Sequence, residues 1–430
     1  MSSIKQKILS LSKDKESTTL ADNFMWLAVL KIVSYAFPFI TLPYLARVIG
    51  VDCFGEIAFA ASIMVFIETF VDFGFNYTAT RDIARQREDV NATSKIFSNV
   101  MWAKTLLMLI GFGILCTFTY SIPSLYEKRL LLFLTFLYVP GHIIFPDWFF
   151  QAMEKMKYIT IMNVLSKLLF TVLIFVVIRE KSDYIWQPLL NAIGYWVSGS
   201  IAMWFIIKRF GIKIMRPQFS EVCDSIKGSW NMFLSLLFPN LYTNFSTILL
   251  RSTCGEVATG LFDAGRRFDS LVQQFFQVLS RTFFPFLSRR LDRHKQYVII
   301  SGGLSIIACL CLYFGAGFII KVFFTPEFEP AITVIKILSI SPFAQFLMDS
   351  YGTNYLILKG KENIYRNITI VFSIFGFMTS ILITPQYSYI GMAITIVSAR
   401  LVGGVLTYIF AKRTKYDESH KSSFSSNIEG

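Results

Sequence analysis

Long uncharged apolar runs are the feature of this sequence that most restricts its fold. Residues 105–126, 184–207 and 298–320 contain no charged side chain, and each run is long enough to cross a bilayer core about 30 Å thick, which takes roughly 20 helical residues. A fourth uncharged run, 367–399, is too long for one span, and the sequence PQYS at 385–388 divides it. Lipid offers no hydrogen-bond partners, so spanning segments must be helices or closed barrels. These runs do not alternate in polarity and therefore predict helices.

Composition supports the same class. Charged residues make up 16% of the chain and hydrophobic residues 54%, whereas soluble domains carry about 25% charge. The net charge of +13 would suggest a nucleic-acid partner in a soluble protein. Here the basic residues lie in short connections between apolar runs, so membrane topology explains them and no nucleic-acid partner is expected. We predict an all-α polytopic membrane protein.

The apolar runs predict about twelve transmembrane helices. Their expected bounds are 23–45, 54–76, 98–120, 130–150, 159–178, 186–207, 229–250, 258–284, 297–320, 330–356, 367–384 and 389–411. Connections on one side of the membrane would hold few of the 41 Lys and Arg residues, namely Arg47, Lys128, Arg129, Arg179, Lys181, Arg251 and Lys321. Because cytoplasmic loops are enriched in Lys and Arg, both termini are predicted to be cytoplasmic.

Five segments follow from this topology. We expect a cytoplasmic N-terminal arm at 1–21, an N-lobe of six helices at 22–207, a cytoplasmic inter-lobe loop at 208–228, a C-lobe of six helices at 229–411 and a cytoplasmic tail at 412–430. The arm has no apolar region followed by a small-residue cleavage site, so no cleaved signal peptide is expected.

The two lobes show a weak internal repeat. LARVIG at 45–50 is followed by GEIA at 55–58, and about 205 residues later Leu250-Arg251 is followed by GEVA at 255–258 and Gly260. Glycine in such a connection permits positive φ and a close approach of helix ends. Six is an even number of spans, so both lobes would enter the membrane from the same side. This predicts a pseudo-two-fold axis along the membrane normal.

Two stretches near the N-terminus carry a family resemblance. PYLARVIG at 43–50 with the following Phe54-Gly55, and GFNYTATRDIA at 74–84, resemble the Wzx-type O-antigen repeat-unit flippases. These belong to the polysaccharide transporter family of the multidrug/oligosaccharidyl-lipid/polysaccharide flippase superfamily. Over the rest of the chain the resemblance is one of topology. The resemblance points to Arg47 and to the segment 74–84, but it assigns a role to neither. We take Arg47 as a candidate substrate-binding residue.

The resemblance implies a function. The substrate would be an undecaprenyl-pyrophosphate-linked O-antigen oligosaccharide, moved by alternating access from the cytoplasmic to the periplasmic leaflet of a bacterial inner membrane. A polysaccharide polymerase and a chain-length regulator would be possible partners. Two alternatives are a multidrug or metabolite antiporter of the same superfamily and a membrane-embedded glycan polymerase or ligase. The short outward loops leave little room for a catalytic loop, so no enzymatic activity is expected.

Charged side chains inside the predicted spans are the candidate functional residues. Each costs about 2.5–3.5 kcal/mol near the bilayer centre on insertion scales, so such residues usually face the protein interior. They are the bases Lys31, Lys104, Lys167, Arg266, Arg267, Lys336 and Arg400 and the acids Glu68, Asp72, Asp147, Asp263, Asp269 and Asp349.

The span at 258–284 is the richest in charge. Asp263 lies on the same helix face as Arg266 and Arg267, three and four residues on. A guanidinium binds phosphate oxygens with two parallel hydrogen bonds, so either arginine could bind the pyrophosphate. The alternative is an intrahelical ion pair that stabilises the lobe. Asp263 and Asp269 are assigned to ion coupling or to structural ion pairs.

The remaining candidates have similar pairs of interpretations. Lys167 and Arg400 are expected to bind substrate or to be paired, and Lys31 and Lys104 could instead extend to the inner surface. Glu68 and Asp72 share a helix face and could couple transport to protons or pair with bases on neighbouring helices. The isolated histidines His142 and His294 predict no metal site, and without a GxxxxGK[ST] motif no ATP hydrolysis or other cofactor is expected.

Overall fold

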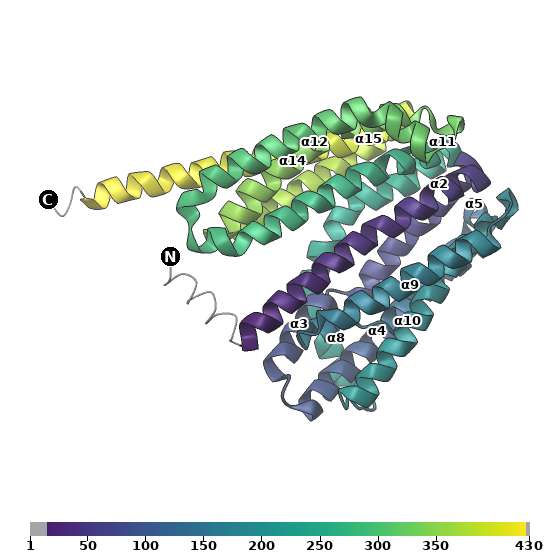
Figure 1. Ribbon diagram of the computed structural model, residues 1–430, viewed down its shortest axis with the longest axis horizontal. Coiled ribbons are helices and arrows are strands. Elements are labelled where there is room, and N and C mark those ends of the chain that lie inside the picture. Colours follow the sequence, from purple (N-terminus) through teal and green to yellow (C-terminus); the bar gives the residue numbers. More distant parts are fainter. Residues whose placement is uncertain (1–14, 427–430) are drawn as a thin grey trace. The chain divides into compact units, whose positions relative to one another are not determined.

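The computed structural model describes residues 15–426, apart from the side chains of residues 15–24, 27, 28, 31, 32, 34–36, 285 and 415–426. Within this range the regular structure is entirely helical, and no strand occurs (Figure 1). The predicted all-α class is therefore confirmed.

The chain divides into two compact units. The N-terminal unit comprises Met1–Ile49 and Ile63–Leu236, and the C-terminal unit comprises Gly50–Ser62 and Leu237–Gly430. The elements up to residue 209 are α2 (Lys15–Asp72), α3 (Phe75–Gln86), α4 (Val90–Ser121), α5 (Pro123–Tyr126), α6 (Arg129–Phe136), α7 (Tyr138–Ile143), α8 (Asp147–Ala152), α9 (Met156–Val177), η1 (Lys181–Trp186) and α10 (Gln187–Arg209). The later elements are α11 (Phe219–Arg289), η2 (Leu291–Arg293), α12 (His294–Phe323), η3 (Pro326–Phe328), α13 (Ala331–Leu338), α14 (Ser341–Leu347), the π-helix η4 (Met348–Ile357) and α15 (Glu362–Ser426).

Each unit has its own core. In the N-terminal unit α9 and α10 lie side by side (Figure 1), and the buried ring of Trp148 stacks on Phe97 with a centroid distance of 5.5 Å. In the C-terminal unit Phe262 of α11, Val334 and Leu338 of α13 and Ile396 of α15 form one buried cluster. The core of the C-terminal unit is thus built from helices that are far apart in the sequence.

Three helices, α2, α11 and α15, are too long to be single membrane spans. At 1.5 Å per residue, the 71 residues of α11 would extend about 107 Å, more than three times the bilayer core. The backbone is non-helical at one internal residue in each: Gly50 of α2 (φ 73°, ψ 177°), Gly255 of α11 (φ 90°, ψ 178°) and Ser388 of α15 (φ 53°, ψ −138°). The break at Ser388 lies at the end of the PQYS sequence, where the sequence predicted one.

In the described part of the chain, nine helices are long and apolar enough to cross a membrane. Three of them, Phe37–Gln86, Phe219–Arg289 and Glu362–Thr414, contain the three breaks. A multi-spanning protein is what the sequence predicted. The count of twelve spans and the two-lobe symmetry stay predictions, which the breaks support.

The inter-lobe loop is shorter than expected. The sequence predicted a loop at 208–228, but α10 continues to Arg209 and α11 begins at Phe219. Glu221 lies in the first turn of α11, where a negative charge is favoured by the helix dipole. Its carboxylate also contacts Lys95 Nζ at 2.6 Å and accepts a hydrogen bond from Asn99 at 3.0 Å. These contacts to α4 explain the earlier helix start.

The units also divide the chain differently from the predicted lobes. Residues 50–62 of α2 belong to the C-terminal unit, where Phe54 contacts Phe328 edge to face at a centroid distance of 5.6 Å. The first part of α11 belongs to the N-terminal unit, where Phe233 stacks on Phe73 at 4.3 Å. At the other end, α15 continues as helix to Ser426, within the predicted tail.

The glycines of the internal repeat pack against each other within the C-terminal unit. A Cβ atom on Gly55 would lie 1.9 Å from the carbonyl oxygen of Glu256, and one on Gly260 would lie 2.0 Å from that of Val51. With a repeat offset of 205 residues, Val51 corresponds to Glu256 and Gly55 corresponds to Gly260. Gly55 therefore contacts the counterpart of Val51, and Gly260 contacts Val51 itself. Such reciprocal contacts are typical of a two-fold axis. The correspondence is thus Gly50 with Gly255 and Gly55 with Gly260. The sequence comparison had instead placed GEIA at 55–58 opposite GEVA at 255–258.

We predict that Gly260→Ala destabilises the protein by about 1–3 kcal/mol, because the new methyl group would displace the backbone at Val51. The measurement is the thermal unfolding midpoint of the purified full chain in detergent. Gly303→Ala on α12 is the matched control, since a Cβ there meets nothing within 4 Å. The control should unfold at the wild-type temperature or slightly above it, and an unchanged midpoint for Gly260→Ala would contradict the close helix contact.

Candidate functional site

A buried ion pair joins two helices of the C-terminal unit. Arg400 Nη1 of α15 lies 2.7 Å from Asp269 Oδ2 of α11 and donates to Ser341 Oγ of α14 at 2.6 Å. Gln273, one turn along α11, donates to both carboxylate oxygens of Asp269 at 3.0 and 3.1 Å. The side chains of Asp269 and Arg400 are 1% and 10% exposed. A buried pair requires this number of hydrogen bonds to offset desolvation.

Arg267 forms the intrahelical pair that the sequence offered as an alternative. Its Nε and Nη2 atoms each lie 2.9 Å from Asp263 Oδ2, at the i,i+4 spacing. Its guanidinium also lies over the Phe54 ring, 4.6 Å from the centroid. The charge of Arg267 is therefore compensated on two sides.

The neighbouring Arg266 is bound differently. Its Nη1 atom donates to the Thr243 carbonyl oxygen at 3.4 Å and to Thr247 Oγ1 at 3.3 Å, both on the preceding part of α11. Among the described residues, no carboxylate forms an ion pair with Arg266. Its side chain is half-buried in a segment long and apolar enough to span the membrane.

Another pair in this unit was not predicted from the sequence. Glu56 of α2 is 3% exposed and accepts hydrogen bonds from Arg251 of α11, with its Oε1 atom 2.5 Å from Nη2 and 3.1 Å from Nε. Arg251 was assigned to an outward loop, but it lies within α11 and its guanidinium is 5.8 Å from the Phe59 ring centroid. The sequence signal was the repeat, in which Arg251 precedes Gly255. It could have suggested an acidic partner near the equivalent glycine, Gly50.

The N-terminal unit contains a second buried pair. Lys104 of α4 is 2% exposed, and its Nζ atom lies 2.7 Å from Asp72 Oδ1 at the end of α2. The same ammonium donates to Asn76 Oδ1 of α3 at 3.2 Å, and Asn76 in turn donates to Asp72 at 3.3 Å. Lys104 therefore does not extend to the inner surface, and Asp72 has the basic partner that the sequence left as one of two interpretations.

His142 joins this group and corrects the sequence analysis, which treated it as isolated. Its Nδ1 atom on α7 lies 3.5 Å from Glu68 Oε1 and 4.0 Å from Asp72 Oδ1. Tyr138, one turn earlier, donates to Glu68 Oε1 at 3.2 Å. The histidine is isolated only along the sequence, because α2 and α7 are brought together by folding. A histidine inside an apolar span was the available signal.

The group also bears on the expectation of no metal site. One ligand atom from each of Glu68, Asp72 and His142 lies within 4.8 Å of the others, which is a spacing that could hold a cation. The ammonium of Lys104 already contacts Asp72 and supplies positive charge at this position. The arrangement fits a neutralised hydrogen-bonded network better than a metal centre.

Three further candidate residues are Arg47, Lys167 and Lys31. Arg47 on α2 is exposed and makes no hydrogen bond or ion pair with the described residues. Lys167 on α9 is half-buried. The side chain of Lys31 lies outside the described residues.

The segment 74–84 forms α3 and its N-cap, and it contacts the first part of α11. Gly74 has φ 83°, and a Cβ there would lie 2.7 Å from Met232 Cβ. Thr78 and Ser229 share a hydrogen bond of 2.7 Å between their hydroxyl oxygens. This gives the segment a packing role inside the N-terminal unit.

Comparison with known proteins relates the chain to polysaccharide biosynthesis. The family profile described as "Polysaccharide biosynthesis protein" matches residues 20–291, which is more than half of the chain. A protein of Escherichia coli (strain K12), provisionally named an O-antigen transporter, is 27% identical over 408 residues, covering 92% of this chain and 98% of the relative. A Shigella dysenteriae protein of the same name is 25% identical over 383 residues, covering 87% and 95%.

Solved structures show the same fold. The lipid II flippase MurJ in its inward closed conformation superposes with a TM-score of 0.69 at 14% identity, covering 91% of this chain and 87% of MurJ. An inward-facing MATE multidrug resistance transporter of the MOP superfamily gives a TM-score of 0.66 at 14% identity, covering 93% and 99%. At this identity the likeness establishes the fold alone. The family match shows that the chain belongs to the polysaccharide biosynthesis protein family, and its multi-spanning helical fold is shared with solved transporter structures.

Proposed function

We propose that this protein is a flippase that moves undecaprenyl-pyrophosphate-linked O-antigen oligosaccharide units from the cytoplasmic to the periplasmic leaflet of a bacterial inner membrane. The family, the names of the two bacterial relatives and the shared fold with a lipid II flippase support this proposal. The Lys and Arg distribution supports cytoplasmic N- and C-termini. A polymerase and a chain-length regulator would act on the delivered units.

The substrate defines what the protein must supply. The lipid tail can stay in the bilayer, but the sugars and the pyrophosphate cannot enter hydrocarbon without polar partners. The pyrophosphate is an anion, and a guanidinium matches its oxygens in charge and geometry. A binding residue should therefore be an arginine within the spans whose charge is not already neutralised.

Arg266 meets this requirement, and its contacts are the observation that carries the proposal. In the C-terminal unit Arg251, Arg267 and Arg400 each contact a carboxylate. Among the described residues, the hydrogen bonds of Arg266 go to two neutral oxygens of its own helix, at 3.3 and 3.4 Å, which are long for hydrogen bonds from a charged donor. A pyrophosphate would provide the shorter, charge-assisted contacts that Arg266 lacks.

The proposed mechanism is alternating access. The pyrophosphate and sugars enter from the cytoplasmic leaflet, and the protein then opens toward the periplasm. A ligand drives such a change only if it binds the two states with different affinity. Arg266 is suited to this role because its present partners are weak and can be exchanged for the substrate, whereas Arg267 and Arg400 would have to give up strong ion pairs.

Deletion of the gene with complementation tests the function directly. We expect the deletion strain to lose long surface polysaccharide and to accumulate the complete lipid-linked unit on the cytoplasmic side, and the intact gene to restore both. The measurements are gel analysis of surface glycan and quantification of lipid-linked intermediates. Single units that reach the outside without being joined would indicate a polymerase, and unchanged glycan with increased sensitivity to cationic drugs would indicate an exporter.

In the same strain we expect Arg266→Ala to lower transport by tenfold or more, since a hydrogen bond to a charged group contributes about 1.5–3 kcal/mol. Arg266→Lys should retain part of the activity because it keeps the charge but not the paired donors. Arg267→Gln, at the adjacent position, is the matched control and should transport nearly normally. Normal flipping by the Arg266→Ala/Arg267→Ala double variant, with equal membrane insertion, would refute the pyrophosphate role.

The Asp269–Arg400 pair should behave as a structural unit. Asp269→Ala alone should destabilise the purified protein by about 3–5 kcal/mol, because it leaves a buried uncompensated arginine. The double variant Asp269→Leu/Arg400→Met should recover most of the lost thermal stability, since neither charge then remains buried. If the losses of Asp269→Leu and Arg400→Met, each measured alone, simply add in the double variant, the side chains are not coupled.

A further inference from the structure

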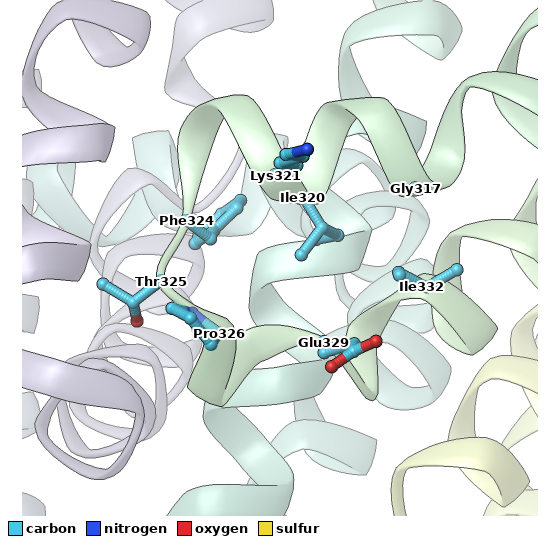
Figure 2. Close-up of a pocket in the computed structure, with 8 residues that line it drawn as sticks. All are labelled: Gly317, Ile320, Lys321, Phe324, Thr325, Pro326, Glu329 and Ile332. Carbon is cyan, nitrogen blue, oxygen red and sulfur yellow. The ribbon is translucent and has the colours of Figure 1, made fainter.

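A cavity of about 290 Å³ lies in the C-terminal unit at the end of α12. Its walls are the last turns of α12, the connection that contains η3, and the first turn of α13 (Figure 2). The candidate span Leu291–Phe323 ends here and the next begins at Ala331. The cavity therefore lies where the chain leaves and re-enters the membrane, at a bilayer surface.

Two opposite charges line this cavity. Lys321 extends from α12 and Glu329 from the segment that precedes α13 (Figure 2). Both side chains are exposed, and neither forms an ion pair with the other or with any other described residue. One positive and one negative group on the two sides of a cavity suit a ligand that carries both charges.

Most of the remaining lining is apolar and continues onto a surface that faces lipid. Ile320 and Phe324 are part of the cavity wall. Further back along α12, Phe314 and Phe318 are 77% and 71% exposed, which in a membrane-spanning helix means contact with acyl chains. A ligand with a polar end in the cavity and an apolar chain along α12 is a membrane lipid.

We propose that this cavity binds the headgroup of phosphatidylethanolamine. The lipid phosphate contacts Lys321, while the primary ammonium donates to Glu329. Phosphatidylcholine presents a quaternary ammonium with no N–H to donate, and phosphatidylglycerol has no cation for Glu329. The primary ammonium therefore distinguishes the ligand from both.

The test is native mass spectrometry of the purified full chain with equimolar phosphatidylethanolamine, phosphatidylcholine and phosphatidylglycerol. We expect the wild type to retain phosphatidylethanolamine several-fold more than either other lipid. Glu329→Gln should lower this retention to the phosphatidylcholine level without lowering that of phosphatidylglycerol. Lys321→Gln should lower the retention of all three lipids, because they share the phosphate that Lys321 contacts.

Two further variants locate the site. Glu327→Gln is the matched control, because Glu327 is exposed in the same connection but does not line the cavity, and its retention should equal that of the wild type. Gly317→Leu should lower the retention of phosphatidylethanolamine with both charges intact, since nothing within 4 Å opposes a Cβ at this cavity-lining position. Equal retention of phosphatidylethanolamine and phosphatidylcholine by the wild type, or unchanged retention by Gly317→Leu, would overturn the proposal. None of these measurements depends on flipping activity.

Discussion

In the hydrocarbon core of a bilayer, neither a backbone amide nor a charged side chain can be satisfied by water, so the chain must provide every partner itself. Helices satisfy the backbone within each span. The charges are satisfied between spans, by Lys104 with Asp72 in one unit and by Arg400 with Asp269 in the other. Each of these pairs joins helices that are far apart in the sequence. Because a shift of one helix would leave both charges buried and unpaired, the pairs fix which faces of the helices meet.

Glycine residues determine how closely two helices of the C-terminal unit approach each other. Gly55 and Gly260 have no side chain, so their helices can meet through backbone atoms, and the glycines at 50 and 255 turn the chain immediately before this contact. Near the contact, Arg251 reaches Glu56. Glycine packing and a buried ion pair therefore act at one place in the C-terminal unit. This explains why residues 50–62, although part of α2, belong to that unit.

Two adjacent arginines on one helix differ in whether their charge is already paired. Arg266 and Arg267 are indistinguishable as a sequence pattern, and both could bind a pyrophosphate. The structure places Arg267 against Asp263 and the Phe54 ring and places Arg266 against two neutral oxygens. The difference arises from a rotation of about 100° between successive helical positions, which gives the two side chains different neighbours. The proposed assignment to Arg266 rests on those neighbours.

The sequence by itself determined the class of the protein, because long uncharged apolar runs admit only spanning helices, and its motifs determined the family resemblance. It also identified Asp72, Lys104, Asp269 and Arg400 as charged residues within predicted spans, and it left open whether each is paired or has another role. It could not identify the partners. His142 was set aside for lack of a neighbour in the chain, and it meets Glu68 only because α7 packs against α2. Pairing across helices depends on the faces they present and on where they cross, which only the tertiary structure decided.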